Sequence, residues 1–221
     1  MMKINPMPRR LDAGLLEALN SVATNDIGHH RYWGMMSPHL RPISPGMRVV
    51  GTAVTVIAPA TDSAMIPHVL GLIRPGDVLV IDRLGDRQHA CLGSVVTLAA
   101  RVAGLAGIIV DGYATDLQEI QEQGFPLWCR GETAAMSKLQ AVAGAINVPV
   151  SCGGVAVTPG DAILADAHGI CVLPGEDIRP LVDSISAAAQ KRPGRIARLQ
   201  AGEKLGDVNG VSARIAAALK D

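Results

Sequence analysis

GDVLVID at residues 76–82 and GLAGIIVDG at residues 104–112 are two short apolar runs, and each carries an aspartate at or near its end. Their valine and isoleucine content is typical of β-strands, which we place at residues 77–81 and 107–110. A helical pattern over residues 94–103 separates the two strands. Strands that alternate with helices predict a parallel sheet with right-handed connections, so the fold class is α/β.

The flanking sequence continues this alternation and then changes. A valine-rich strand is expected at residues 47–57, and helices are expected at 11–22, 64–72 and 116–123. After Phe125 the apolar runs shorten and are separated by Gly and Pro, which predicts antiparallel or mixed pairing. The elements expected there are strands at 127–129, 148–152, 155–158, 162–165 and 169–173, and helices at 181–189, 196–200 and 212–219.

Composition bounds the class of protein. A chain of 221 residues suffices for one sizeable core, so we expect a single domain over residues 1–221. Hydrophobic residues make up 48% and charged residues only 18%, which favours a homo-oligomer whose copies cover apolar surface. Twenty basic and twenty acidic residues, with five aromatics, disfavour nucleic-acid binding. No apolar run approaches the ~18 residues of a membrane span, so no membrane partner is expected.

Four cysteines are widely spaced, without a C-x-x-C pair. This usage is typical of a reducing compartment, and we expect a cytoplasmic protein. Neither a P-loop nor a G-x-G-x-x-G fingerprint occurs, which disfavours nucleotide chemistry.

Aspartates follow the strands expected at residues 77–81 and 107–110, at the carboxyl ends of the strands where ligands of α/β sheets bind. They are Asp82, Asp86, Asp111 and Asp116. If the strands are parallel neighbours, these carboxylates gather around one cleft and suit a hard cation such as Mg²⁺. Alternatively, Asp116 caps the helix that begins at Leu117, and Glu119 completes a capping box. Spacing alone leaves both interpretations open.

An ordered series of motifs carries a resemblance to a known family. It comprises GDVLVID (76–82), GDR (85–87), LG (92–93), GLAGIIVDG (104–112), NVPV (147–150), GGV (153–155), PGD (159–161) and ADAHG (165–169). Over roughly residues 10–205 the chain resembles the RraA-like family, which includes the class II 4-hydroxy-4-methyl-2-oxoglutarate / 4-carboxy-4-hydroxy-2-oxoadipate aldolases and the regulators of ribonuclease E activity. The resemblance implies a three-layer β/β/α swivelling-domain fold with a mixed sheet, an N-terminal helix and a C-terminal helical tail. It also implies a trimer or hexamer with active sites between subunits.

The resemblance also implies site residues. In the family's aldolases a divalent metal, Mg²⁺ or Mn²⁺, is bound at positions that match Asp116 and Glu119. Two backbone amides after a helix-start glycine hold the oxo-acid. Gly93 matches that glycine, and Val95 and Val96 match the residues whose amides hold the acid.

At other positions of the site the chain is less similar to the family's aldolases. A downstream lysine corresponds to Lys138. The chain has Thr115 where the family's aldolases have arginine, and Ser94 where they have an acid. Threonine does not replace a bidentate guanidinium, so we consider Arg83, Arg87 and Lys138 as alternatives for the missing positive charge.

The function implied is a metal-dependent lyase. A metal chelated by a 2-oxo acid withdraws electrons, and the adjacent C–C bond breaks to a pyruvate enolate. Aldolase and oxaloacetate decarboxylase activities both follow from that enolate. Thr115 and Ser94 favour the alternative, a binding protein of the ribonuclease-regulator type that kept the scaffold and lost the chemistry.

The segment His29-His30-Arg31-Tyr32-Trp33 holds two of the five aromatic residues. One interpretation is a substrate pocket or lid near the N-terminal helix. The other is a subunit interface, where aromatic residues are enriched.

Overall fold

The computed structural model describes residues 2–220, which divide into two compact units. The first unit extends to Leu181 and contains every strand, whereas the second begins at Val182 and is helical. Helix α6, Gly175–Gln200, begins in the first unit and continues into the second. Within the described residues no helix combines the length and the apolar character that a bilayer crossing requires.

The two apolar runs at residues 76–82 and 104–112 form neighbouring strands at the centre of the sheet. Four strands lie side by side and parallel: β3 (Val49–Ile57), β4 (Asp77–Asp82), β5 (Gly107–Val110) and β6 (Leu127–Cys129). Val54 pairs with Leu79, which pairs with Ile108 on its other side. The parallel arrangement expected from the alternating strands and helices is confirmed.

The remaining strands pair mostly antiparallel. They are β1 (Met2–Ile4), β2 (Arg41–Pro42), β7 (Gly144–Ile146), β8 (Val150–Cys152), β9 (Val155–Val157), β10 (Ala162–Ala165) and β11 (Ile170–Leu173). Strand β10 is antiparallel to both β11 and the first half of β3, β7 is antiparallel to the end of β3, and β8 pairs with β9 as a separate hairpin. The mixed sheet is therefore confirmed, although sequence periodicity missed the short strands β1, β2 and β7.

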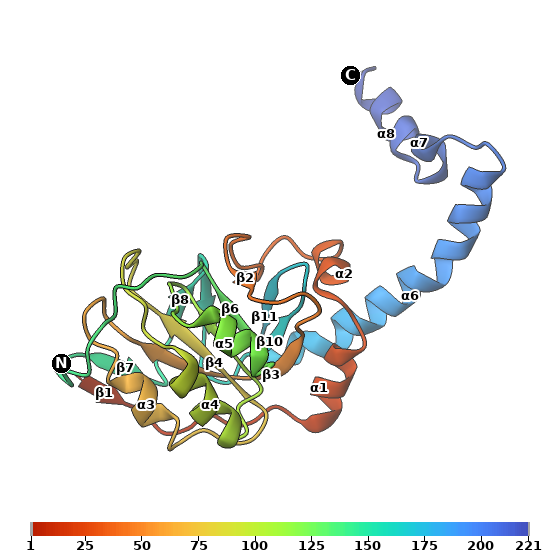
Figure 1. Cartoon of the computed structure of the whole chain (residues 1–221). Helices are drawn as coiled ribbons and strands as arrows, with labels where there is room; N and C mark the ends of the chain where they lie inside the picture. Colours follow the sequence, from red (N-terminus) through yellow and green to blue (C-terminus); the bar gives the residue numbers. More distant parts are fainter. Residues whose placement is uncertain (1, 221) are drawn as a thin grey trace. The chain divides into compact units, whose positions relative to one another are not determined.

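Two hydrophobic cores lie on the two faces of the central strands. In β4, Leu79 and Ile81 enter one core, while Val78 and Val80 enter the other, because successive side chains of a strand alternate. The first core packs against helices α3 (Met65–Val69), α4 (Ser94–Val102) and α5 (Leu117–Glu122), which lie on one face of the sheet (Figure 1). The second core contains residues of β8 to β11. These helix, sheet and strand layers give the expected three-layer β/β/α fold.

The helices near the two ends of the chain have boundaries that differ from those expected from the sequence. At the N-terminus α1 covers Ala13–Asn20, capped by Asp12, whose carboxylate accepts a hydrogen bond from Gly14 N at 2.8 Å. A short helix, α2 (Thr24–Gly28), follows it. In α6 the helix runs through Pro193, so the two separate helices expected over residues 181–200 are wrong. Helices α7 (Leu205–Val208) and α8 (Val211–Ala218) contain no buried residue.

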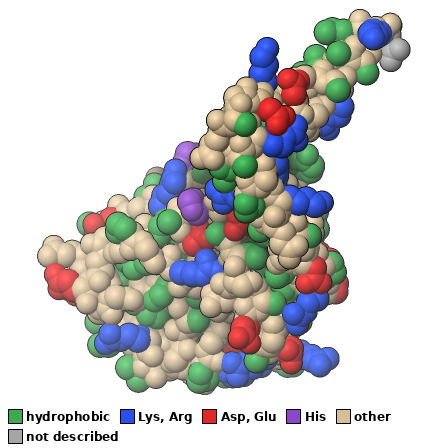
Figure 2. All heavy atoms as spheres, turned by 90° about the vertical axis from the view of Figure 1, so that its right-hand side faces the viewer, with side chains coloured by type: hydrophobic (Ala, Val, Ile, Leu, Met, Phe, Trp, Pro, Cys, Tyr) green, Lys and Arg blue, Asp and Glu red, His purple; other side chains and the backbone are tan. Residues whose placement is uncertain are grey.

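Acidic and basic side chains are interspersed on the surface. The face drawn in Figure 2 shows both signs among apolar side chains, without one dominant charged patch. This distribution agrees with the equal numbers of acidic and basic residues.

Candidate functional site

The start of α4 meets the loop that joins β5 to α5. Ser94 donates from its backbone N and its Oγ to Asp116 Oδ2, at 3.1 and 3.3 Å. Thr115 Oγ1 donates to Asp116 Oδ1 at 3.1 Å, and Thr115 N donates to Leu92 O at 3.0 Å. Four residues predicted for the site, Gly93, Ser94, Thr115 and Asp116, are therefore brought together.

Gly93 is required at this junction for space. A Cβ atom built on Gly93 would lie 2.8 Å from the Thr115 methyl group and still closer to the Asp116 carboxylate. The φ of Gly93 is −149°, a value open to any residue, so backbone conformation is not the constraint. The missing side chain leaves room for the carboxylate beside the first turn of α4.

Asp116 does not cap its own helix. It precedes α5 with φ 58° and ψ 36°, and its side chain makes no capping hydrogen bond there. A capping residue normally has extended backbone, so the left-handed conformation explains why the expected cap and its capping box with Glu119 are wrong. Instead, Glu132 Oε1 accepts a hydrogen bond from Leu117 N at 3.1 Å. No local sequence pattern points to Glu132, which lies fifteen residues after Leu117.

The other residues of the first turns of α4 and α5 face different surroundings. Val95 is 78% exposed, whereas Val96 is partly buried and packs against the helix-side core. The amides of both lie in the first turn of α4, where N–H groups have no partner within the helix. Such amides bind anions well. Glu119 lies exposed in the first turn of α5.

Lys138 is exposed on a segment that another carboxylate holds in place. Its backbone N donates to Thr61 O, and its O accepts from Ser63 N, both at 2.9 Å. Between these residues, the buried Asp62 accepts backbone N–H bonds from each of residues 140–143 at 2.8 to 3.3 Å. Burial raises the pKa of Asp62, but these bonds and one from Ala64 lower it overall to about 2.

Arg87 contacts a different aspartate. Its Nη1 donates to Asp86 O at 3.0 Å and to Asp111 O at 3.2 Å. Asp111 Oδ1 lies 3.5 Å from the Arg87 guanidinium and 2.5 Å from Arg130 Nε, while Gly153 N donates to Oδ2 at 2.8 Å. Arg87 thus belongs to an Asp111-centred group, which its sequence position did not indicate.

The four aspartates do not form one acidic cluster. Asp82 accepts bonds from Leu84 N at 2.7 Å and Ser151 N at 3.1 Å, and Asp86 and Asp111 have their own arginine partners. Across residues 2–220 no three His, Cys, Asp or Glu side chains are placed to hold a metal ion. The four aspartates therefore do not form one set of metal ligands, since backbone N–H groups and arginines engage three of the four carboxylates.

The donors around Asp116 still fit a hard cation. The Asp116 carboxylate and the Ser94 hydroxyl lie together at the start of α4, where Gly93 leaves room for the carboxylate. Mg²⁺ is commonly held through one or two carboxylates and keeps several waters, so a full protein cage is not needed. Mg²⁺ or Mn²⁺ therefore suits this donor set better than zinc, which takes mainly nitrogen and sulfur ligands.

The cysteines belong to the cores. All four are free and buried. Burial raises the pKa of Cys91 and Cys171 to about 12 and that of Cys129 to about 11, and it also raises the pKa of Cys152. Because the thiolate is the nucleophile, these thiols are poor candidates for catalysis.

The aromatic pair near the N-terminus is exposed. Tyr32 is fully exposed and Trp33 is 54% exposed. The Arg31 guanidinium lies 3.5 Å from the centroid of the Trp33 ring and 2.8 Å from Asp177 Oδ2. Arg31 therefore links the Trp33 ring to the start of α6.

Comparison with known proteins agrees with this architecture, a three-layer α/β domain with a carboxylate at a helix start. The sequence profile of the RraA-like family, described as Aldolase/RraA, matches residues 15–172. The chain therefore belongs to the RraA-like family.

Two curated relatives carry aldolase names. A protein of Halalkalibacterium halodurans, provisionally named 4-hydroxy-4-methyl-2-oxoglutarate aldolase, is 42% identical over 61% of this chain and 64% of its own length. The 4-hydroxy-4-methyl-2-oxoglutarate aldolase of Thermus thermophilus is 34% identical over 51% of this chain and 68% of its own. The matched region thus spans about two thirds of each relative.

A solved structure carries a different name. Streptomyces coelicolor RraAS2, described as an unusual member of the RNase ES inhibitor RraA protein family, superposes with a TM-score of 0.74 at 30% identity. The match covers 86% of this chain and 98% of that protein. The family therefore includes both named aldolases and named inhibitors of RNA processing.

Proposed function

We propose that this chain is a divalent-metal-dependent lyase, an aldolase or decarboxylase that cleaves a C–C bond of a small 2-oxo acid through a pyruvate enolate. The observation that carries the proposal is the Asp116 carboxylate, which faces Ser94 at the start of α4 instead of capping its own helix. Its left-handed backbone supports this proposal, because such conformations cluster at functional sites. The aldolase names of the relatives point the same way.

Each residue has a role in this proposal. Asp116, with Glu119 nearby on α5, would hold Mg²⁺ or Mn²⁺. When bound, the cation supplies Lewis-acid polarisation of the 2-keto group. Ser94 N and Oγ fix the orientation of the Asp116 carboxylate, and Thr115 Oγ1 fixes its other oxygen.

The substrate is held by the start of α4. The amides of Val95 and Val96 would bind the carboxylate of the oxo-acid, with the favourable end of the helix dipole behind them. Lys138 and Arg87 supply positive charge to the developing enolate in this proposal. The contacts of Arg87 with Asp111 reduce the charge that it has to offer, so Lys138 is the stronger candidate.

Pyruvate release tests the proposal. Purified protein with Mg²⁺ or Mn²⁺ should release pyruvate from oxaloacetate or from a 4-hydroxy-2-oxo acid, and Asp116→Ala should abolish both this activity and Mn²⁺ binding measured by electron paramagnetic resonance. Asp12→Ala, which removes a carboxylate that caps α1, is the matched control. Turnover that survives Asp116→Ala unchanged contradicts the proposal.

A second candidate is a binding protein that regulates a ribonuclease. The similarity to RraAS2 favours it, because that match covers 86% of this chain and 98% of that protein. A ribonuclease E-type enzyme should then be retained by the immobilised protein and lose activity in its presence. Clear pyruvate release without any effect on RNA cleavage would exclude this candidate.

Assembly and location belong to the same proposal. We expect a trimer or hexamer in the cytoplasm, with sites between subunits. The exposed valines and leucine of α4, Val95, Leu98 and Val102, form an apolar stripe at helical spacing, which agrees with a covered surface. Light scattering of the purified protein gives the copy number, and a monomer at micromolar concentration contradicts this part.

A further inference from the structure

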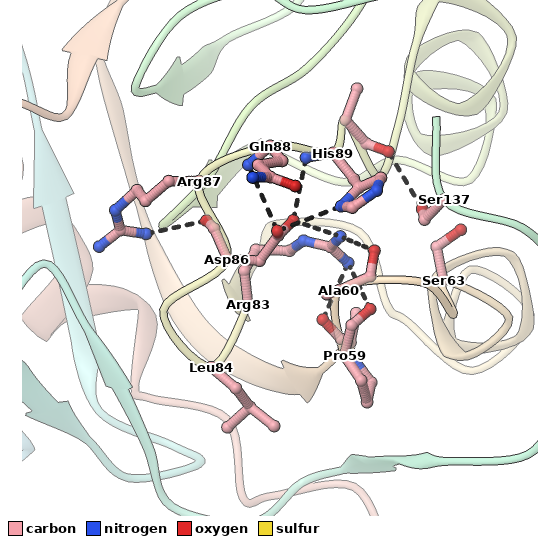
Figure 3. A network of polar contacts seen from close by, with 12 residues as sticks. Pro59, Ala60, Ser63, Arg83, Leu84, Asp86, Arg87, Gln88, His89 and Ser137 are labelled. Atoms are coloured by element: carbon pink, nitrogen blue, oxygen red, sulfur yellow. Dashed lines mark hydrogen bonds and ion pairs between the residues drawn. The ribbon is translucent and has the colours of Figure 1, made fainter. Parts of the chain in front are cut away.

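The loop after β4 holds a buried arginine at the base of a polar network (Figure 3). Arg83 is fully buried, and its Nη1 donates to Ala58 O at 2.8 Å and to Pro59 O at 3.1 Å. Its Nη2 donates to Ala60 O at 2.8 Å and to Asp86 Oδ2 at 3.2 Å. The guanidinium stays charged, so it places a permanent positive charge beside Asp86.

Asp86 in turn orients a histidine. Asp86 Oδ2 accepts a hydrogen bond from His89 N at 3.1 Å, and Oδ1 lies 3.2 Å from His89 Nδ1. Burial raises the pKa of Asp86, but hydrogen bonds from His89, Gln88 and Arg83 lower it overall, so the carboxylate is ionised. A carboxylate only accepts, so Nδ1 carries the proton and Nε2 of the neutral ring keeps its lone pair.

Exposure increases along this chain of contacts. The Arg83 side chain is fully buried and that of Asp86 is 7% exposed, while that of His89 is 27% exposed. Figure 3 shows the three side chains in this order, with the histidine ring on the side of Ser63 and Ser137. A histidine whose Nδ1 is held by a carboxylate, on a side chain that is partly exposed, has the arrangement of a proton-transfer group.

Strain in the same loop indicates that its shape is imposed. Leu84 has φ 52°, a conformation that a bulky residue rarely adopts. Its N donates to Asp82 Oδ1 at 2.7 Å, which holds the turn closed. Strained loops of this kind are typical of functional sites.

A strip of backbone connects His89 to the Asp116 site. Ala90 pairs with Tyr113 in parallel, Cys91 N donates to Tyr113 O at 3.3 Å, and the strip ends at Gly93. His89 and Gly93 are four residues apart, a span of at most ~13 Å in extended backbone. A Cβ atom at position 93 would meet the Asp116 carboxylate, so the segment that begins at His89 ends at the Asp116 site.

We propose that His89 Nε2 is the base that takes the hydroxyl proton of a 4-hydroxy-2-oxo acid, while Asp86 and Arg83 position the ring. This inference rests on the proposed function. The proton moves from the C4 hydroxyl to Nε2, and the O–H electron pair forms the C4 carbonyl. The C3–C4 bond breaks, and its electrons enter the pyruvate enolate. The proton on His89 is then available to C3, so the ring returns to its starting state.

Decarboxylation of oxaloacetate provides an internal comparison. Its C3–C4 bond breaks when the C4 carboxylate leaves as CO₂, with the same enolate but without a hydroxyl proton to remove. His89→Gln should therefore lower retro-aldol cleavage roughly 100- to 10,000-fold. Decarboxylation should change less than about threefold, because the Asp116 site is untouched. His68→Gln, at an exposed histidine of α3, is the matched control and should change neither rate.

A spectroscopic measurement tests the positioning without any turnover. In ¹⁵N-labelled protein the neutral His89 ring should carry its proton on Nδ1, and long-range ¹H–¹⁵N correlations assign that tautomer. Asp86→Asn should shift the ring toward the Nε2-protonated form and lower retro-aldol cleavage more than decarboxylation. A ring protonated on Nε2 in the unmodified protein overturns the inference.

The rates separate the two proposals. Equal loss of both activities in His89→Gln assigns a structural role to His89 and overturns the inference while the lyase remains. The inference is also overturned if His89→Gln leaves both activities unchanged, because the ratio of the two rates is then unaltered. Absence of both activities in the unmodified protein, or activities indifferent to Asp116→Ala, overturns the proposed function and the base assignment together.

Discussion

The carboxylates of Asp62 and Asp116 differ in the hydrogen-bond donors that surround their oxygen atoms. Asp62 is 2% exposed and accepts backbone N–H groups from Ala64 and from four consecutive residues, 140–143. Asp116 is partly exposed and accepts one backbone N–H and two hydroxyl groups, from Ser94 and Thr115. A carboxylate surrounded by main-chain donors stabilises the fold, whereas one held at its edge by hydroxyl groups retains capacity for a ligand.

The largest effect is expected at Asp116. Asp116→Ala should reduce pyruvate release roughly 100-fold or more, because it removes the carboxylate that is proposed to hold the cation. The free energy of unfolding should change little, since the side chain is partly exposed and caps α4 from outside. Steady-state kinetics and urea denaturation measure the two effects. If Asp116→Ala strongly lowers the free energy of unfolding but leaves the activity intact, Asp116 has the structural role assigned to Asp62, and the contrast is wrong.

At Asp62 the same substitution should act on stability. Asp62→Ala removes the shared acceptor of five backbone N–H groups and should destabilise the protein by about 3 kcal/mol. Urea denaturation gives this value, and hydrogen exchange should show lost protection of residues 140–143. Asp12→Ala, at an exposed helix cap, should cost only about 1 kcal/mol. Equal destabilisation by both variants would contradict the role of the buried contacts.

The pH dependence of stability should report Asp62. Its pKa is about 2 in the folded protein and about 3.9 in the unfolded chain. A lowered pKa means stabilisation that is complete above pH ~4 and is lost as the pH falls toward 2. The difference in unfolding free energy between the unmodified protein and Asp62→Asn should therefore shrink between pH 5 and pH 2. If this difference in unfolding free energy stays constant between pH 5 and pH 2, the stabilisation by Asp62 comes from packing and not from its charge.

A smaller effect is expected at Gly93. Gly93→Ala places a methyl group against the Asp116 carboxylate and the Thr115 methyl, so the carboxylate must move. We expect about a tenfold loss of activity, with weaker Mn²⁺ binding, because 1 Å displacements in a site have effects of this order or larger. Gly28→Ala is the control, since a Cβ there meets nothing within 4 Å. Identical activity of the two variants would show that the carboxylate tolerates displacement.

The smallest effect concerns the cap of α5. Glu132→Gln keeps an acceptor for Leu117 N but removes the charge near the helix start. We expect destabilisation below about 1 kcal/mol, as for other exposed charges at helix ends. Thermal unfolding in low and high salt measures it, because salt screens the charge. A loss of activity larger than tenfold would instead place Glu132 beside Asp116 in the site.

The central strands were predictable from sequence, and the short edge strands were not. Runs such as Val78 to Ile81 are long and apolar enough to be recognised, and their parallel order follows from the intervening helices. Strands β1, β2 and β7 have two or three residues, so they carry no periodicity. Two separate helices were expected at residues 181–189 and 196–200, whereas α6 is continuous from Gly175 to Gln200 and includes Pro193.

The site was predictable only in part for a similar reason. The closeness of Gly93, Thr115 and Asp116 follows from neighbouring loops at the same edge of the sheet. The cap from Glu132 and the four amides around Asp62 depend on contacts between segments 15 and about 80 residues apart, with no local pattern. The cap considered for Asp116 was one of two interpretations, and it took into account only donors of the helix that follows Asp116.

The two-sided burial of β4 restricts how the gene for this protein can change in length. Deletion of one codon within residues 77–82 would turn each later side chain to the opposite face and exchange the contents of the two cores. Neither packing would survive, since both faces are filled with branched side chains. Codons can be gained or lost without this damage in the connecting loops, so variation in length among related sequences should concentrate there.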